Sequence, residues 1–286
     1  GDFLVSLCQL GNNRGIGFDN SYVERPEHAA LGEQVLFIQD FYSEKYAEYQ
    51  GDLVCCRQVL EHIQQPADML EPVRTTIGDS RETAVFFEVP NALYTFDNMM
   101  IWDIIYEHCT YFAPVSLAYT FAAAGYRTEA VREEFGGQFI SIEAYPADAK
   151  IVGVDKAAVK ALSETIATFG IRFEAQMTQW RTTLDEIFAQ GEKVVIWGSG
   201  SKGVTFLNLL ELGDRIEYAV DINPRKQNKY IPGTGQRIVA PEEMVAYQPD
   251  IVIVMNPLYE QEIGGMLKDL GLTPTLMTTE SFAIAA

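Results

Sequence analysis

The stretch V-V-I-W-G-S-G-S-K-G, residues 194–203, decides the fold of the second half of the chain. Gly198, Gly200 and Gly203 form a complete G-x-G-x-x-G motif between a predicted strand and a predicted helix. Such a loop points backbone amides at a pyrophosphate. Asp221, 18 residues after Gly203, ends the next predicted strand, where a carboxylate accepts ribose hydroxyls. The pattern alone predicts a Rossmann-like unit and leaves bound NAD open.

Alternating strand and helix patterns extend to both sides of this loop. Toward the C-terminus the predicted strands are 193–197, 216–220, 250–255 and 275–277, and the predicted helices are 202–210, 241–247 and 259–270. Toward the N-terminus the predicted strands are 14–18, 35–38, 52–56, 83–89, 126–132 and 138–145, and the predicted helices are 2–10, 67–77 and 114–124. Gly136-Gly137 separates the last two of these strands and predicts an antiparallel hairpin. The alternation is typical of an α/β protein with parallel sheets covered on both faces.

The length of 286 residues fits two domains of ordinary size. A proline-free amphipathic stretch over 156–190 separates the two alternating patterns. We therefore expect a first domain over 1–150, a helical connector over 151–190 and a second, smaller doubly wound domain over 191–286.

Composition excludes several classes of protein. Hydrophobic residues make up 48% and charged residues 21% of the chain, which is typical of a soluble globular protein. The formal net charge of −19 argues against nucleic acid or an anionic membrane as a partner, so a phosphate-bearing ligand needs local cations and backbone amides. No window reaches about 18 uninterrupted apolar residues, so no membrane-spanning segment is predicted and the expected location is the cytoplasm.

The four cysteines predict buried structural thiols in a reducing cytoplasm; they are Cys8, Cys55, Cys56 and Cys109. They form no C-x-x-C motif and no cluster of zinc-binding spacing with histidine, so no metal site is expected in this chain. The opening residues have no basic segment or cleavage site typical of a signal peptide, and no initiator Met. The chain is expected to begin inside a longer protein.

Two carboxylates follow predicted strands of the first half. Asp19 comes after G-I-G-F, and Asp40 comes after V-L-F-I-Q. In a doubly wound sheet this edge binds ligands, so Asp19 is a candidate acceptor for ribose hydroxyls and Asp40 for an adenine amino group. The alternative is that each carboxylate only caps the turn or helix that follows it.

The stretch D-L-V-C-C-R-Q-V-L-E-H-I-Q-Q-P, residues 52–66, resembles class I S-adenosylmethionine-dependent methyltransferases. In that family this segment forms the fourth strand and the loop beneath the cofactor. The opening G-D-F-L-V-S-L-C-Q-L is similar to the tail of the family's glycine-rich loop. The resemblance implies cofactor-binding roles for Gly1, Asp19, Asp40 and Arg57.

A narrower resemblance begins at Ile105. The sequence I-Y-E-H-C-T-Y-F-A, followed later by E-E-F-G-G-Q-F, resembles C-methyltransferases that act on nucleotide-linked 4-keto-deoxysugars. The matching residues are Glu107, His108, Tyr111, Phe112, Gly136, Gly137 and Gln138, whereas Ala113 replaces a frequent Ser.

The reaction of this family suggests a role for several of the matching residues. Methylation beside a ketone needs a base, and histidine is suited to that task near neutral pH. His108 is the predicted base. Glu107 or Tyr106 is expected to orient the imidazole or to donate a hydrogen bond to the enolate oxygen. The resemblance implies that Tyr111 and Gln138 bind substrate. His62 is a weaker candidate, and His28 is expected at the surface.

The second half resembles the C-terminal domain of the same sugar C-methyltransferases, through residues 197–210, 220–235 and 238–244. In that domain the Rossmann-like shape is retained and closes over the nucleotide-sugar, which disfavours NAD. The implied diphosphate-binding residues are Gly200, Lys202, Arg225 and Lys226. The alternative is that the cationic residues are solvated turn charges.

The resemblance also implies segments of the family's proteins that are not found in residues 1–286. Complete members begin with a cysteine-rich zinc-binding domain, then the first strand and the full glycine-rich loop. The family's strand order is 3-2-1-4-5-7-6, so we expect a truncated chain with an interrupted sheet and poor binding of S-adenosylmethionine. Zinc is expected only in the absent domain, and a homodimer is one way to fill the gap.

The leading hypothesis is therefore an S-adenosylmethionine-dependent C-methyltransferase of deoxysugar biosynthesis. Its expected partner is a nucleotide-diphosphate sugar, methylated on a carbon next to the ketone. Three alternatives stay open: an NAD-dependent oxidoreductase that uses residues 198–203, a methyltransferase of another acceptor, and a chain that only binds nucleotide-sugars.

Overall fold

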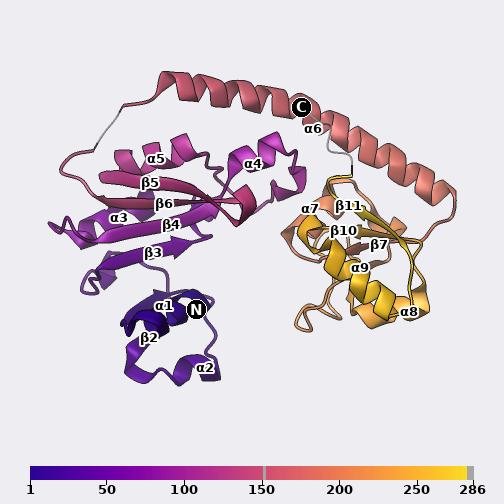
Figure 1. Ribbon diagram of the computed structural model, residues 1–286, viewed down its shortest axis with the longest axis horizontal. Coiled ribbons are helices and arrows are strands. Elements are labelled where there is room, and N and C mark those ends of the chain that lie inside the picture. Colours follow the sequence, from indigo (N-terminus) through magenta and orange to yellow (C-terminus); the bar gives the residue numbers. More distant parts are fainter. Residues whose placement is uncertain (151–152, 282–286) are drawn as a thin grey trace. The chain divides into compact units, whose positions relative to one another are not determined.

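A computed structural model describes residues 1–150 and 153–281 of the chain (Figure 1). It divides into two compact units. The N-terminal unit comprises 1–89, 116–132 and 141–153, and the C-terminal unit comprises 90–115, 133–140 and the chain from 154 onward. The sequence placed a boundary at residues 150 and 151, of which 151 lies outside the described residues. The division observed differs because 90–115 and 133–140 cluster with the C-terminal unit.

The first strands of the N-terminal unit form a small parallel sheet. Strand β1 (Gly15–Phe18) pairs in parallel with β2 (Val35–Ile38), and the short helix α2 (Pro26–Ala29) lies between them in sequence. Helix α1 (Asp2–Gly11) packs closely on β1, because a Cβ at Gly15 would lie 2.6 Å from both Cys8 Sγ and Leu4 Cδ1. The helix predicted over 2–10 and both strands are thus confirmed.

A second sheet of the N-terminal unit has the order β3-β4-β6-β5. Its strands are β3 (Leu53–Arg57), β4 (Ala84–Pro90), β5 (Tyr126–Glu134) and β6 (Phe139–Pro146), and the accompanying helices are α3 (Ala67–Ile77) and α5 (Pro114–Ala123). Strand β3 is parallel to β4. Strands β5 and β6 are neighbours joined through Gly136 and Gly137, whose φ values of 64° and 89° suit the predicted turn.

The two sheets do not join through any strand among the described residues. The described residues of this unit thus form two separate sheets, and the strand order implied by the resemblance stays a prediction. Strand β3 is only partly covered, with Leu53 48% exposed, whereas Phe87 and Val89 of β4 are fully buried. The apolar run over β3 therefore lies at an open edge.

The C-terminal unit contains a five-stranded parallel sheet with the order β11-β10-β7-β8-β9. Its elements are β7 (Val194–Trp197), α7 (Ser201–Leu209), β8 (Tyr218–Val220), β9 (Arg237–Val239), α8 (Met244–Tyr247), β10 (Ile251–Val254), α9 (Glu260–Asp269) and β11 (Thr275–Thr278). Helix α9 buries Ile263 and Leu267 in one core cluster of the sheet, and α7 buries Phe206 and Leu207 in the other. The doubly wound prediction is confirmed, except that β9 was missed.

One continuous helix, α6 (Lys156–Ala189), occupies the predicted connector. The Asp155 carboxylate caps it by accepting hydrogen bonds from the amides of Ala157 and Ala158, at 2.9 and 3.1 Å. No helix in the described ranges is long and apolar enough to cross a membrane.

The segment before α5 belongs to the core of the C-terminal unit. It contains α4 (Ala92–Asp97) and a short 3-10 helix, η4 (Ile101–Asp103). Trp102 of η4 is 1% exposed and packs against Trp180 of α6 and Phe206 of α7, at ring-centroid distances of 6.2 and 4.7 Å. This burial explains why residues that the sequence assigned to the first domain cluster with the second.

The cysteines differ from the expectation. Cys8 is buried, Cys55 and Cys56 are half-buried, and Cys109 is exposed. The two neighbouring thiols are less covered than predicted because β3 is an edge strand. Burial still raises the pKa of the Cys56 thiol to about 12, so this thiol is protonated at neutral pH.

Candidate functional site

The two candidate adenosine-binding carboxylates lie at the same edge of the small parallel sheet. Register pairs Phe18 with Ile38, so Asp19 follows β1 directly and Asp40 follows β2 after one further residue. The Asp19 Oδ1 atom accepts hydrogen bonds from the Ser21 amide at 2.8 Å and the Ser21 hydroxyl at 2.7 Å, which lower the pKa of the carboxyl. Asp19 is exposed and charged at neutral pH, and it caps its own turn.

Asp40 is held by three donors. Lys45 forms an ion pair with it, the Tyr46 hydroxyl donates at 2.6 Å, and the Phe41 amide donates at 2.8 Å. The hydrogen bonds from Lys45 and Tyr46 lower the pKa of the Asp40 carboxyl to about 2. The carboxylate therefore stays ionised throughout the physiological range, and its adenine-binding role stays a prediction.

Gly1 is the N-cap residue of α1, where a side chain would meet the rings of two other residues. A Cβ there would lie 2.8 Å from His28 Cε1 and 2.9 Å from Phe37 Cζ. His28 is 4% exposed, so its expected surface position is wrong. Its ring stacks on Phe37, with Nε2 3.2 Å from Asp2 Oδ1 and Nδ1 3.1 Å from the Tyr22 hydroxyl. These contacts with residues distant in sequence cover the imidazole.

Arg57 lies at the end of β3 and is engaged by its own unit. Its Nη2 and Nε atoms donate to Glu88 Oε1 at 2.8 and 3.1 Å, and its guanidinium lies 4.6 Å from the centre of the Phe3 ring. These contacts fix the guanidinium at the carboxyl end of β3. Contact with a cofactor stays a prediction for this residue.

The Y-E-H-x-x-Y-F segment lies in the C-terminal unit. The His108 amide donates to the Ile105 carbonyl at 3.2 Å, and the imidazole packs edge-on against Tyr111 at a centroid distance of 6.0 Å. Tyr106 is 99% exposed. Tyr111, rather than Tyr106, is thus the tyrosine that lies beside the imidazole. The orienting role of Tyr106 or Glu107 stays a prediction.

Asn91 joins the two parts of the predicted substrate-binding signature, a role that the sequence reasoning missed. Its amide N–H donates to the Gln138 carbonyl at 2.9 Å, and its side chain donates to the Gly137 carbonyl at 3.0 Å. Asn91 also forms a parallel bridge with Phe112, and it is 2% exposed. The only local signal was its position directly after Pro90 at the end of a strand.

The glycine-rich loop of the C-terminal unit follows β7, between that strand and α7. Gly198 has a φ of 116°. A Cβ at Gly203 would lie 2.2 Å from the Gly198 carbonyl oxygen, whereas the nearest atom to a Cβ at Gly200 is Lys226 Nζ at 3.9 Å. The first and third glycines are thus required by the turn and the helix–strand packing, as the fingerprint predicts.

Replacing Gly203 with Ala is expected to lower the free energy of unfolding of the C-terminal unit by about 3 kcal/mol, because the added methyl group meets fixed backbone. Gly200→Ala is the matched control in the same loop, and it is expected to cost at most about 1 kcal/mol, the usual penalty for Ala at a helix N-cap. Denaturant titrations of the two variants test this order. Equal midpoints would contradict the packing role of Gly203.

The Asp221 carboxylate is already hydrogen-bonded within the protein, so it is not available to a ribose in the way that the fingerprint predicts. Its Oδ2 atom accepts from the Ser199 hydroxyl at 2.5 Å, the Ser199 amide at 3.1 Å and Lys226 Nζ at 3.1 Å, and Oδ1 accepts from the Asn223 amide at 2.9 Å. Burial raises the pKa of this carboxyl, but these hydrogen bonds outweigh burial and hold the pKa below its usual value. The donors occupy the oxygens that an NAD ribose would need.

The cations near the loop are also engaged. Lys202 forms an ion pair with Asp103 at 2.8 Å, and Lys226 forms one with Asp221 at 3.1 Å. Arg225 is exposed in the turn that follows β8, where its amide donates to Asn223 Oδ1. Of the three predicted diphosphate-binding cations, Arg225 alone has no ion pair within 4 Å among the described residues.

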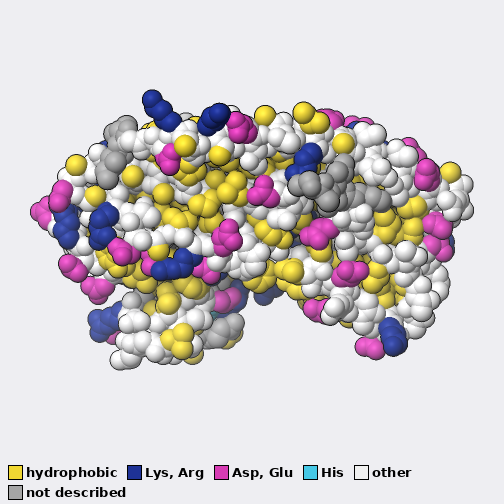
Figure 2. Space-filling view, turned by 45° about the horizontal axis from the view of Figure 1, so that its top comes forward, with side chains coloured by type: hydrophobic (Ala, Val, Ile, Leu, Met, Phe, Trp, Pro, Cys, Tyr) yellow, Lys and Arg dark blue, Asp and Glu magenta, His cyan; other side chains and the backbone are white. Residues whose placement is uncertain are grey.

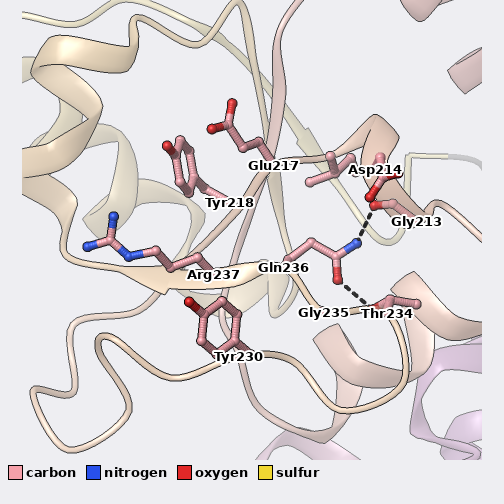
Figure 3. A pocket seen from close by; sticks show the side chains of 10 residues that line it. Gly213, Asp214, Glu217, Tyr218, Tyr230, Thr234, Gly235, Gln236 and Arg237 are labelled. Atoms are coloured by element: carbon pink, nitrogen blue, oxygen red, sulfur yellow. Dashed lines mark hydrogen bonds between the residues drawn. The ribbon is translucent and has the colours of Figure 1, made fainter.

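A pocket of about 350 Å³ lies elsewhere on the C-terminal unit, at the amino ends of β8 and β9 (Figure 3). Tyr218, Tyr230, Glu217 and Arg237 contribute side chains to it. Gln236 is fixed there by donating to the Gly213 carbonyl at 2.8 Å and by accepting from the Thr234 hydroxyl. Asp221 follows the opposite, carboxyl end of β8, so the pocket contains none of the predicted site residues.

The predicted site residues therefore divide between the two units. The candidate cofactor-binding residues Gly1, Asp19, Asp40 and Arg57 belong to the N-terminal unit, and the candidate base and substrate-binding residues belong to the C-terminal unit. On the face drawn in Figure 2, basic side chains are scattered among acidic ones and form no continuous basic surface.

Two stretches of the chain match known families. Residues 1–131 match a family described as a methyltransferase domain, and residues 146–271 match the C-methyltransferase C-terminal domain. The C-methyltransferase NovU of Streptomyces niveus is 28% identical over 222 residues, which cover 74% of this chain and 52% of NovU. The chain thus spans about half the length of this curated relative.

Solved methyltransferase structures also match. The N,N-8-amino-8-demethyl-D-riboflavin dimethyltransferase RosA of Streptomyces davawensis is 18% identical, with a TM-score of 0.43 over 51% of this chain and 47% of RosA. The magnesium protoporphyrin IX methyltransferase ChlM of Synechocystis PCC 6803 is 17% identical, with a TM-score of 0.37 over 51% of this chain and 69% of ChlM.

The family matches agree with the α/β architecture of the chain. Residues 1–131 are thus similar to methyltransferase domains and residues 146–271 to the C-terminal domain of C-methyltransferases, and the chain has a Rossmann-like α/β fold.

Proposed function

We propose that this chain transfers a methyl group from S-adenosylmethionine to a carbon next to the ketone of a nucleotide-linked 4-keto-deoxysugar. The observation that carries the proposal is that one chain matches both a methyltransferase domain and a C-methyltransferase C-terminal domain. The Y-E-H-x-x-Y-F segment, inside the first of these two stretches, has a histidine beside a tyrosine, which suits proton removal next to a carbonyl.

The residues of the N-terminal unit fit the adenosine part of this cofactor. Asp19 and Asp40 are ionised carboxylates at the ends of two adjacent parallel strands, the usual place for ligands of such sheets. A Cβ at Gly1 would clash with His28 and Phe37. Gly1 lies at the start of α1, where the first backbone amides have no partner within the helix and are available to a ligand. The bound cofactor supplies an electrophilic methyl group, and Asp19 holds the ribose hydroxyls.

His108 acts as the base in this mechanism. It removes a proton from the carbon beside the ketone, which leaves an enolate. With S-adenosylmethionine bound, the electron pair of that carbon would take the cofactor's methyl group, and the electrons of the methyl–sulfur bond would stay on the sulfur of S-adenosylhomocysteine. Tyr111 packs on the imidazole and limits its orientation, because the rings are 63° apart and 6.0 Å between centres.

A second candidate is a methyltransferase that uses the same cofactor but another acceptor. The family that residues 1–131 match is described only as a methyltransferase domain, and this description names no acceptor. The NAD-dependent oxidoreductase is disfavoured because three donors already saturate Asp221 Oδ2.

Product analysis separates these reactions. The protein, as its gene encodes it, is incubated with S-adenosylmethionine carrying a ¹³C-labelled methyl group and with nucleoside-diphosphate-linked 4-keto-6-deoxyhexoses. We expect a labelled methyl group bonded to a quaternary or tertiary sugar carbon in the ¹³C spectrum. A label bonded to oxygen, or no label in any keto-sugar while another acceptor is methylated, would overturn the proposed substrate class.

A further inference from the structure

The ion pair between Lys202 and Asp103 links two parts of the C-terminal unit that are distant in sequence. Lys202 is the second residue of α7, next to the glycine-rich loop, and its Nζ lies 2.8 Å from Oδ1 and 3.1 Å from Oδ2 of Asp103. The two side chains are only 22% and 25% exposed. Removing one partner of an ion pair that is covered to this degree destabilises the folded state, because the other charge is left without compensation.

Asp103 is the last residue of η4 and lies five residues before His108. On its N-terminal side, Ile101 and Trp102 are anchored in the core at 0% and 1% exposure. Burial raises the pKa of the Asp103 carboxyl, and Lys202 acts in the opposite direction. Without the ammonium group, the Asp103 carboxyl lowers its free energy by moving into water or by taking up a proton.

After Asp103, Ile104 is partly buried and packs against the same core, and Phe112 is 4% exposed, with its carbonyl accepting from the Ala92 amide at 2.9 Å. Tyr106, Glu107 and Cys109, which lie between these residues, are exposed. We call residues 104–111, which include His108, the histidine loop. The Asp103 ion pair and the packing of Ile104 attach its N-terminal side to the C-terminal unit.

We propose that Lys202 is a positioning residue, which acts through Asp103 to hold the histidine loop in place. This assignment replaces the role of Lys202 as a diphosphate ligand, because its ammonium group is already bound by both oxygens of Asp103. Its consequence for catalysis rests on the proposed function, in which His108 is the base. Its structural part, the hold on the loop, does not.

The structural part is tested by amide hydrogen exchange in the protein without ligands. Lys202→Met keeps the length of the side chain and removes the charge, and we expect amides of 103–108 to exchange roughly tenfold faster or more. Lys202→Arg keeps the charge and is expected to restore most of the protection. Arg215→Met is the control, since it breaks an exposed ion pair with Asp185 in the same unit and is expected to leave 103–108 unchanged.

The catalytic part is tested by kinetics on the keto-sugar. A positioning role predicts that Lys202→Met lowers kcat roughly tenfold or more while KM for the nucleotide-sugar stays within a few-fold. Asp103→Asn combined with Lys202→Met is expected to be no worse than Lys202→Met alone, because the two residues act as one unit.

Two results would overturn the proposal. Unchanged exchange of 103–108 in Lys202→Met would show that the pair does not hold the loop. A raised KM with unchanged kcat would make Lys202 a substrate ligand. Failure of the proposed function is a separate result, since the wild-type protein would then form no C-methyl product while the exchange experiment still reports on the loop.

Discussion

Replacing His108 with Asn is expected to lower the rate of methyl transfer by ~10²–10⁴-fold, the usual effect of losing a general base. Affinity for S-adenosylmethionine is expected to stay within a few-fold, because the base acts on the sugar and not on the sulfonium. The most direct measurement is exchange in D₂O. Without cofactor, the wild-type protein is expected to replace the hydrogen next to the ketone with deuterium, and His108→Asn is expected to lose this exchange.

Asp19→Ala is the matched contrast to this variant. Each charge-assisted hydrogen bond from a ribose hydroxyl contributes about 1.5–3 kcal/mol, so the variant is expected to bind S-adenosylhomocysteine at least tenfold more weakly. Its exchange of the hydrogen beside the ketone is expected to persist. Normal turnover by His108→Asn would refute the assignment of the base, and unchanged cofactor affinity in Asp19→Ala would refute the ribose role.

Local signals in the sequence located most of the elements. Helix α3 begins and ends at the predicted residues, since Pro66 precedes it and Gly78, with a φ of 64°, follows it. Strand β9 was missed because it has three residues and follows a turn that contains Gly233 and Gly235, both at positive φ. Its pairing with β8 is a non-local interaction, and no periodicity over three residues predicts it.

The sequence predicted candidate residues of the site but not their contacts. The motif singles out His108, whose role as base stays a prediction, whereas the packing of Tyr111 against the imidazole depends on how the loop folds and has no sequence signal. Lys202 was a candidate diphosphate ligand because it is a cation beside the glycine-rich loop. Its ion pair with Asp103, 99 residues away, has no sequence pattern, so the sequence could not predict this contact.

Trp102 is expected to contribute most to the stability of the segment that carries His108. Its ring, 1% exposed, contacts Trp180 of α6 and Phe206 of α7, which themselves lie 5.0 Å apart between ring centres. Trp102→Ala removes the aromatic group by which η4 joins this cluster. The expected loss is about 3–5 kcal/mol in the free energy of unfolding of the C-terminal unit.

The three tryptophans of the chain, Trp102, Trp180 and Trp197, all belong to the C-terminal unit, so their fluorescence in a denaturant titration follows unfolding of that unit. Trp102→Phe keeps an aromatic ring and removes the indole N–H, which has no hydrogen-bond partner among the described residues, so a loss below about 1.5 kcal/mol is expected. Tyr230→Ala, at a residue 66% exposed, is the surface control and is expected to change stability by less than about 0.5 kcal/mol. If Trp102→Ala unfolded at the same denaturant concentration as Tyr230→Ala, the ring cluster would not be what anchors η4 to the C-terminal unit, and the histidine loop would need another attachment.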